Sequence, residues 1–302
     1  MQSSGSTYKD GLTISLGTRL KAYTALVKPR LTMLVVFSAM FGYFMAPNVG
    51  GFEFMTIAAL ALGGFLITGA SNTLNQVIEI EQDSLMNRTQ KRPLVQKVIS
   101  PLEAIIFAMV TGIAGIVLLG VMFEGIVAAL LGIIALLSYA FVYTPMKRIH
   151  SVGVLIGAIP GAMPPLIGWA AATGNLGIEA WILFLVQFLW QFPHFWAIAW
   201  VLDEDYKRGG FKMLPANGGR TAFTASVILV YTILLVPVCI LPYSFEMVAL
   251  PTAIIMAVAG MAFTAQAWFL LRVRTVKAAS RLMFGSFIYL PVVQIAMLID
   301  KF

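Results

Sequence analysis

One amide and two carboxylates recur at every fourth residue near the end of a long apolar stretch: Asn75, Glu79 and Asp83. Side chains four residues apart lie on the same face of a helix, so the three form a polar stripe, and Glu81 is turned away from it. Like charges at this spacing repel each other, and the negative end of the helix dipole adds to the repulsion. The pattern predicts that the stripe binds a cation.

A second group of acids, Asp203-Glu204-Asp205, follows another long apolar stretch. Carboxylate and amide oxygens suit Mg²⁺, which commonly joins one or two carboxylates to the phosphates of a substrate. If both groups face one cavity, they could hold magnesium ions on a diphosphate. Acids at the end of a helix are also common as solvated caps, and for the second group this alternative stays open.

Basic side chains accompany both acidic groups, and such side chains are the usual partners of phosphate oxygens. We favour Arg88, Arg92 and Lys147 as ligands of a diphosphate, because they lie next to the acidic motifs and to Tyr143. A general excess of basic residues on one side of a membrane protein would place lysine and arginine here as well.

The elements that must position these groups are membrane-spanning helices. Hydrophobic residues make up 60% of the 302 residues and charged residues 11%, and the mean hydropathy is +0.89. A helix needs about 20 apolar residues to cross a bilayer, and open strands cannot satisfy their backbone groups in lipid. We therefore predict an all-α bundle of nine transmembrane helices around a central cavity, with spans near 31–48, 54–78, 101–123, 125–143, 152–172, 178–201, 222–243, 247–271 and 282–299.

The basic residues predict how the chain is oriented. With nine spans, every lysine and arginine except Lys301 falls in connections on one face, and the opposite connections contain only acidic charges. The positive-inside rule makes the basic face cytoplasmic, which places the N-terminus and the opening of the cavity there and the C-terminus on the other side. The net charge of +7 thus reflects topology and membrane lipids, and indicates no nucleic-acid partner.

We expect one domain. Residues 1–20 are interpreted as a polar cytoplasmic tail without a cleaved signal peptide, and residues 21–302 as a single transmembrane domain. The stretch Leu12–Val27 could instead lie along the membrane surface as an amphipathic segment. The lone cysteine, Cys239, excludes a disulfide framework and a thiolate metal cluster.

The fifth span carries Gly153, Gly157 and Gly161 at four-residue spacing, which predicts a face where helices approach closely. Pro160 and the pair Pro164-Pro165 are expected to break or kink this span. Irregular backbone at membrane depth needs shelter in protein or in a cavity, so the span could line a substrate cavity, although plain helix packing explains the glycines equally well.

Several of these strings resemble a known family. Asn75-x3-Glu79-x-Glu81-x-Asp83, with Arg88-Thr89 and Arg92-Pro93-Leu94 behind it, is similar to the first signature of the intramembrane aromatic (UbiA-type) prenyltransferases, although glutamate replaces aspartate at two places. Within that superfamily, three further strings resemble the protohaem IX farnesyltransferases, or haem O synthases. The resemblance covers about residues 20–300, and these strings are Tyr143-Thr144-Pro145-Met146-Lys147-Arg148, Gly157 to Trp169, and Trp190-Gln191-Phe192-Pro193-His194-Phe195-Trp196.

The resemblance implies transfer of a farnesyl group from farnesyl diphosphate to a vinyl group of haem B, which gives haem O. It also implies that Mg²⁺ held by the two acidic motifs binds the diphosphate. Carried over residue by residue, the metal ligands and catalytic residues would be Asn75, Glu79, Asp83 and Asp205. Tyr143 would point at the diphosphate, unless it is an interfacial aromatic anchor.

The acceptor side of the resemblance centres on His194. Relatives that act on quinone precursors carry an aspartate where His194 aligns, so the second motif holds fewer acids here. Imidazole is a common axial ligand of haem iron, and we expect His194, with Trp190 and Trp196 near it, to bind haem. A lone buried histidine is otherwise often a structural hydrogen-bonding group. A haem A synthase or a terminal oxidase assembly factor is an expected partner in the bacterial inner membrane.

Two other functions fit part of the pattern. A prenyltransferase that acts on a quinone or phenolic ring would share the diphosphate site, but the string Trp190 to Trp196 argues against it. A secondary transporter could use the carboxylates to bind Na⁺ or H⁺. Against a transporter, the acids cluster near one membrane face and no inverted repeat is visible.

Overall fold

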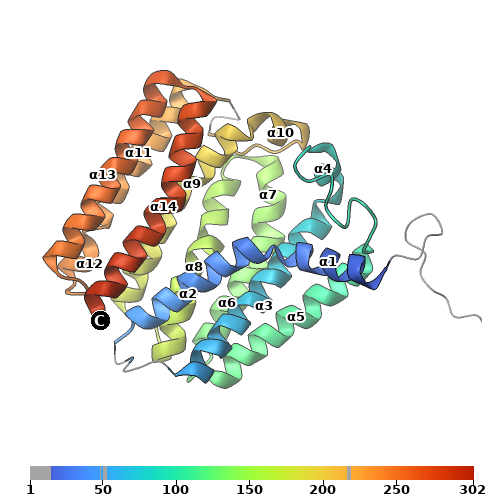
Figure 1. Cartoon of the computed structure of the whole chain (residues 1–302), viewed down its shortest axis with the longest axis horizontal. Coiled ribbons are helices and arrows are strands. Elements are labelled where there is room, and N and C mark those ends of the chain that lie inside the picture. Colours follow the sequence, from blue (N-terminus) through green and yellow to red (C-terminus); the bar gives the residue numbers. More distant parts are fainter. Residues whose placement is uncertain (1–14, 48, 50–52, 216–218) are drawn as a thin grey trace, which may run out of the picture.

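The chain is all-helical in the part that the structure, a computed structural model, describes: residues 15–302 except 48, 50–52 and 216–218 (Figure 1). The predicted fold class is confirmed. The helices are α1 (Leu16–Val27), α2 (Pro29–Met45), α3 (Phe54–Ile78), α4 (Ile80–Leu85), α5 (Pro101–Met122), α6 (Val127–Leu137), the π-helical turn η1 (Ser138–Tyr143), α7 (Thr144–Ile149), α8 (Gly153–Thr173), α9 (Ile178–Val201), α10 (Asp203–Arg208), α11 (Ala222–Val238), α12 (Leu241–Ser244), α13 (Leu250–Val273) and α14 (Val276–Lys301).

Among the described residues, eight helical stretches are long and apolar enough to cross a membrane. Two of them combine adjoining elements, Val127–Ile149 (α6, η1 and α7) and Ala222–Ser244 (α11 and α12), and a ninth span results if α1 and α2 are counted together. Two predicted spans, 54–78 and 178–201, coincide with α3 and α9. The outer face of α5 indicates that these helices lie in a membrane. Ile106, Met109 and Ile113 on this face each expose more than half of their surface. Such a continuous apolar face needs lipid around it, and the chain is an integral membrane protein.

The first span differs from its prediction because it joins a second helix at a bend. The axis of the chain bends by 43° between α1 and α2. Lys28 sits at the corner with a left-handed backbone (φ 49°), and Pro29 begins α2. α1 runs across residue 20, the predicted end of the polar tail. Residues 1–14, which hold most of that tail, lie outside the described part, so the domain boundary stays a prediction.

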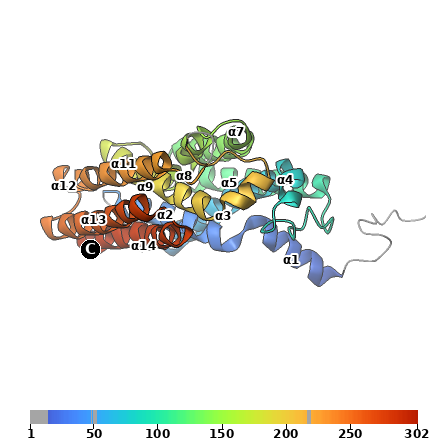
Figure 2. The ribbon, with the colours of Figure 1, turned by 90° about the horizontal axis from the view of Figure 1, so that it is seen from above.

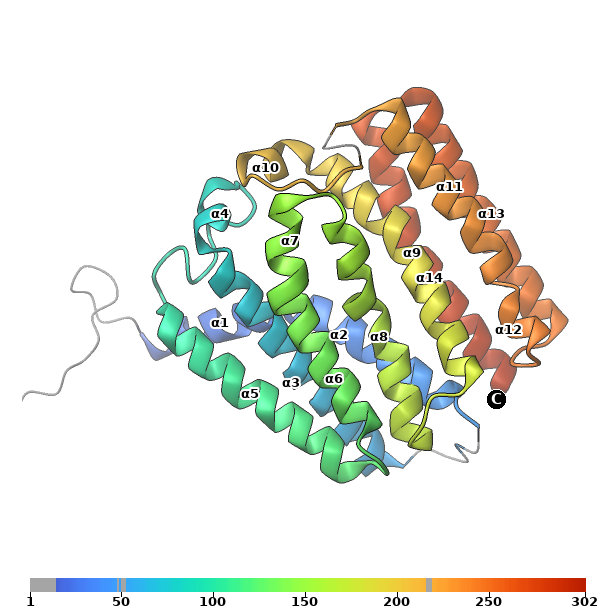
Figure 3. The same ribbon diagram turned by 180° about the vertical axis from the view of Figure 1, so that it is seen from behind.

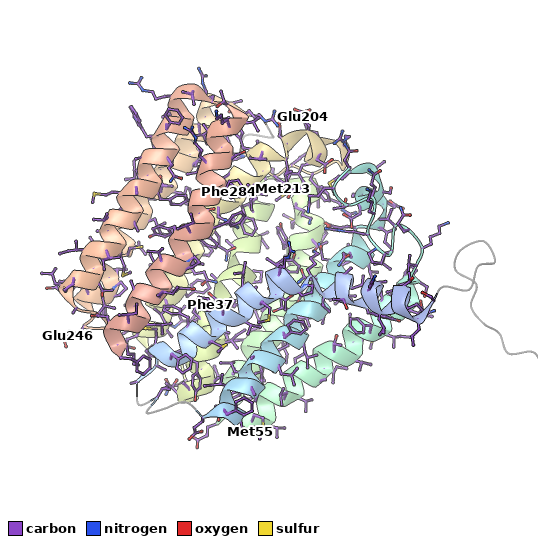
Figure 4. All side chains as sticks on the ribbon, viewed as in Figure 1. Phe37, Met55, Glu204, Met213, Glu246 and Phe284 are labelled. Carbon is purple, nitrogen blue, oxygen red and sulfur yellow. The ribbon has the colours of Figure 1, made fainter. Side chains whose placement is uncertain are left out.

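The helices pack so that the short segments α4, α7 and α10 gather at one end of the bundle (Figure 3). α3 packs on α5, α2 on α8, α8 on α9, and α14 on both α13 and α9. Seen from above, α1 extends away on the side opposite α12 and α13 (Figure 2). Glu204 marks the end that carries α10, whereas Glu246 and Met55 lie at the other end (Figure 4). We call these the α10 end and the far end.

The prolines of α8 do not break it, which corrects that part of the expectation: α8 is one helix from Gly153 to Thr173 with all three prolines inside it. Its glycine face is used as predicted for close packing. A Cβ at Gly157 would lie 2.5 Å from the Tyr143 ring, and one at Gly161 would lie 2.3 Å from the amide of Gln191. The glycines thus let α8 approach both η1 and α9.

The tightest crossing, between α2 and α8, yields a stability prediction. A Cβ on Gly168 would lie 1.7 Å from the carbonyl oxygen of Ala39 and 2.6 Å from the backbone nitrogen of Tyr43. Because backbone atoms cannot move aside cheaply, we expect Gly168→Ala to lower the free energy of unfolding by about 3 kcal/mol. Thermal unfolding in detergent measures this. Gly64→Ala, whose nearest neighbour would be Val36 Cγ2 at 3.7 Å, is the matched control, and equal melting temperatures for the two variants would contradict this packing.

The fourth span contains the π-helical turn η1, which the sequence analysis did not predict. Pro145 lacks the N–H that a continuing α-helix would use, and the amide of Thr144 donates to the carbonyl of Tyr139, five residues back. The turn leaves Thr144 fully buried and Lys147 8% exposed. π-helical turns of this kind occur often at functional sites, and this one brings a threonine and a lysine to the α10 end of the bundle.

Candidate active site

The predicted polar stripe exists at the α10 end, although a helix boundary crosses it. α3 ends at Ile78 and α4 begins at Ile80, but the amide of Asp83 still donates to the carbonyl of Glu79, at 2.8 Å. The register of four therefore continues. Asn75, Glu79 and Asp83 are at most 2% exposed, whereas Glu81 faces outward.

Arg148 supports this boundary. Its guanidinium donates to the carbonyl oxygen of Ile78 at 2.6 Å, which gives a partner to one of the backbone acceptors freed at the end of α3. The string that contains Tyr143 and Lys147 is thereby tied directly to the acidic motif.

Cationic side chains from three different elements surround the stripe. Lys147 Nζ lies 2.7 Å from Glu79 Oε1, and Arg92 forms an ion pair with Asp83. Lys28 Nζ lies 3.5 Å from Asn75 Oδ1 and 3.4 Å from the amide oxygen of Asn72. Buried carboxylates are stable only with such partners, so these lysines and the arginine compensate the charge of the stripe.

Lys28 was missed by the sequence analysis. Nothing near it in the sequence separates it from the other basic residues before the first span. The α1–α2 bend carries it to the stripe, and a bend of this kind gives no strong sequence signal beyond the Lys28-Pro29 junction.

Tyr143 and its neighbours form the wall beside the stripe. Asn75 Nδ2 donates to Thr144 Oγ1 at 3.1 Å, which orients the amide. Lys147 Nζ lies 5.1 Å from the centre of the Tyr143 ring and 4.9 Å from that of Phe211. Tyr143 is buried, so it packs inside the bundle rather than serving as an exposed anchor.

The second acidic group contacts the loop that follows the first. Asp205 accepts hydrogen bonds from the backbone amides of Asn87 at 2.8 Å and Arg88 at 3.2 Å, and pairs with Arg208 at 2.5 Å. Burial raises the pKa of the Asp205 carboxyl, but Arg208 and the two amides outweigh burial and hold this pKa below its ordinary value. Asp203 pairs with Lys207 at 2.8 Å. The second motif is therefore held, through main-chain amides, against the loop that follows the first motif.

The predicted set of four metal ligands is not assembled as one cluster. In the described residues, no three His, Cys, Asp or Glu side chains are grouped as metal ligands. The physical reason is that Lys147 and Arg92 lie against the first two carboxylates, while Asp205 is turned toward backbone amides. Arg88 approaches Asp205 with its amide rather than its guanidinium.

The oxygens of the stripe nevertheless fit a divalent cation. Asp83 Oδ1 is buried and has no hydrogen-bond partner among the described residues, and Glu79 Oε1 has only the ion pair with Lys147. A buried carboxylate oxygen without a hydrogen bond is unfavourable unless a ligand completes it. Hard oxygen donors of this kind suit Mg²⁺.

A small cavity opens beside the second acidic group. It has a volume of about 210 Å³ and is lined by Asp203, Tyr206, Lys207, Ala199 and residues 210–214. Its lining includes carboxylate and lysine side chains, so the cavity at the α10 end is polar.

The predicted haem-binding residues separate into two places. Trp190 stacks on His194 with ring centres 4.3 Å apart, and the two rings face α14. Trp196 faces α11 instead, with its ring centre 5.1 Å from that of Tyr231. The structure therefore brings Trp190 and His194 together but places Trp196 elsewhere on α9.

Comparison with known proteins supports the resemblance noted in the sequence. The model of the UbiA prenyltransferase family matches residues 35–289. The protohaem IX farnesyltransferase of Cytophaga hutchinsonii is 47% identical over 95% of this chain and 99% of its own length. That of Flavobacterium psychrophilum is 41% identical over 93% and 94%, respectively.

Solved structures share the fold. A chain from a structure of digeranylgeranylglyceryl phosphate synthase superposes with a TM-score of 0.77 at 22% identity, covering 94% of this chain and 98% of its own. A UbiA homologue from Archaeoglobus fulgidus, solved with GPP and Mg²⁺, gives a TM-score of 0.66 at 17% identity over 91% and 99%. Since the family model spans most of the residues and the relatives match along nearly their whole length, the chain belongs to the UbiA prenyltransferase family.

Proposed function

We propose that this chain transfers the farnesyl group of farnesyl diphosphate to a vinyl group of haem B and so forms haem O. The observation that carries the proposal is the buried stripe Asn75, Glu79 and Asp83, ringed by cationic side chains at one end of an apolar bundle. Relatives that match this chain along nearly their whole length are protohaem IX farnesyltransferases, which supports haem B as the acceptor.

The stripe binds the diphosphate through a divalent cation. Mg²⁺ would be held by Asn75, Glu79 and Asp83, with Asp205 as the candidate carboxylate of the second motif, and when bound it would neutralise negative charge on the diphosphate. The UbiA homologue from Archaeoglobus fulgidus was solved with GPP and Mg²⁺, with DMAPP and Mg²⁺, and with Cd²⁺; this supports a divalent ion here.

The basic residues stabilise the leaving group. Breaking the carbon–oxygen bond places negative charge on the diphosphate, and positioned cations lower the barrier by binding that charge. Lys147 and Arg92, which now pair with carboxylates, would share the phosphate oxygens. Lys28 would bind the diphosphate from the α1–α2 corner, and Arg88 from the loop held by Asp205.

The aromatic wall stabilises the other product of this cleavage, the allylic cation. The Tyr143 ring already lies near an ammonium group, Lys147 Nζ at 5.1 Å from its centre, and aromatic faces attract cations. The buried, apolar interior keeps water from the cation until the vinyl carbon of haem attacks it. A water molecule then supplies the hydroxyl of the new side chain, and a proton is released.

Haem B binds beside His194 and Trp190, and Trp196 acts only indirectly through the packing of α9.

The domain is residues 21–302, oriented in the cytoplasmic membrane with the α10 end toward the cytoplasm, because the basic connections lie there. A haem A synthase or an oxidase assembly factor as the onward partner stays a prediction.

The test is an acceptor competition. Purified protein in detergent receives farnesyl diphosphate, Mg²⁺ and equal amounts of two acceptors, haem B and a phenolic acid. The products are separated and identified by mass spectrometry. We expect farnesylated, hydrated haem and no prenylated phenol. A prenylated phenol alone would assign the chain to quinone-type acceptors. Absence of any prenyl product, with uptake of one of these compounds by vesicles that contain the reconstituted protein, would indicate a transporter.

A further inference from the structure

The His194 ring has one hydrogen-bond partner among the residues that the structure describes, and that partner is Ser286 of α14. Ser286 Oγ lies 2.8 Å from His194 Nδ1. The serine is fully buried, in the interface where α14 packs on α9 (Figure 1). The contact joins residues that are 92 positions apart in the sequence, so no local pattern predicts it.

The serine can act only as an acceptor toward the histidine. Its hydroxyl has one proton, and Ser286 Oγ lies 2.6 Å from the carbonyl oxygen of Met283. Two oxygens at that distance need a proton between them, because their lone pairs would otherwise repel each other. The hydroxyl proton therefore points to Met283, and the hydrogen bond to His194 must be supplied by the imidazole.

We propose that Ser286 is a positioning residue that holds His194 with its proton on Nδ1 and so leaves the Nε2 lone pair free to ligate the haem iron. This proposal rests on the proposed function, since it takes haem as the acceptor. Only a ring nitrogen without a proton can bind a metal, and the hydrogen bond at the other nitrogen decides which one that is.

Aromatic contacts fix the plane of the same ring. Trp190 stacks on it at 4.3 Å with an interplanar angle of 21°, and Phe287 meets it edge-on at 5.2 Å. The indole N–H of Trp190 donates to the carbonyl oxygen of Ser286 at 3.0 Å. Ser286 therefore holds both members of the pair, His194 by its hydroxyl and Trp190 by its carbonyl, so that Nε2 keeps one direction.

The test compares Ser286→Ala with Ser286→Thr. Alanine removes the acceptor, whereas threonine keeps a hydroxyl that can still bond to a carbonyl of the preceding helical turn. Each purified variant is titrated with haem B, and the iron–imidazole stretch is measured by resonance Raman spectroscopy of the ferrous complex. We expect Ser286→Ala to weaken haem binding about 10-fold, which is typical of losing a hydrogen bond behind a metal-bound histidine, and to shift the stretch to lower frequency. Ser286→Thr should retain both wild-type values.

His194→Ala calibrates the assay and should abolish the iron–imidazole signal. The proposal is overturned if Ser286→Ala keeps the wild-type affinity and stretching frequency, or if wild-type protein gives no more imidazole signal than His194→Ala. Farnesyl transfer by the wild type is measured in parallel. Product formed without these spectral effects refutes only the role of Ser286, whereas absence of product with haem B refutes the proposed function itself.

Discussion

Replacing Glu79 and Asp83 together by glutamine and asparagine should lower the rate of farnesyl diphosphate consumption by about 1,000-fold or more. Loss of a single positioned electrostatic group at a reacting centre typically reduces turnover by about 100- to 1,000-fold, and here both charges that would hold the cation disappear. The amides keep the shape of the side chains and can still accept hydrogen bonds from Lys147 and Arg92. The measurement is release of diphosphate by purified protein at saturating Mg²⁺.

The matched control for this variant is Glu81→Gln. Glu81 lies between the two residues in the sequence, but it faces outward, so its neutralisation should leave the rate within about twofold of the wild type, as for surface charges in general. If the double amide variant, folded by its melting temperature, released diphosphate at the parental rate, the stripe would have no part in the reaction.

Asp205→Asn should reduce turnover by about 100-fold, as expected for one charged group near the reacting centre. Asp205 forms an ion pair with Arg208 and accepts hydrogen bonds from two backbone amides of the loop that follows the first motif. An asparagine can accept at only one of its two terminal atoms, because the other carries hydrogens. The variant therefore loses a charge at the second motif and loosens the loop that carries Arg88.

Glu204→Gln separates these effects from a general loss of negative charge. The neighbouring Glu204 side chain is 69% exposed and lies 3.6 Å from Arg220 and 4.0 Å from Lys207. An exposed pair of this kind contributes little, so turnover should stay within about twofold of the wild type. Equal activity of Asp205→Asn and Glu204→Gln would show that the second motif acts only as a solvated helix end.

Apolar runs and charge placement predicted most of the fold. Runs of about 20 apolar residues have one stable solution in lipid, the helix, so spans such as 54–78 were placed to the residue. The bend at Lys28 and the π-helical turn before Pro145 were not predicted. Both depend on how a helix end packs against distant elements, and residue types along the chain do not encode this strongly.

The candidate site shows the same division. The four-residue spacing of Asn75, Glu79 and Asp83 defines a helix face, and the structure buries all three. The partners of these groups come from elsewhere in the sequence: Lys28 from the α1–α2 corner, and Ser286 opposite His194. A contact between segments far apart in the chain leaves no local pattern, so sequence reasoning could not find either residue.

The central claim is that the stripe binds the diphosphate of the donor through a divalent cation, and Mn²⁺ electron paramagnetic resonance tests it most directly. Mn²⁺ replaces Mg²⁺, and a farnesyl thiolodiphosphate, which resists cleavage, replaces the donor. All proteins are measured with the analogue present. We predict that wild-type protein and Glu81→Gln then bind Mn²⁺ at least about 10-fold more tightly than the Glu79→Gln/Asp83→Asn variant does. Equal Mn²⁺ affinity and equal analogue affinity in the double variant and the wild type would contradict the claim.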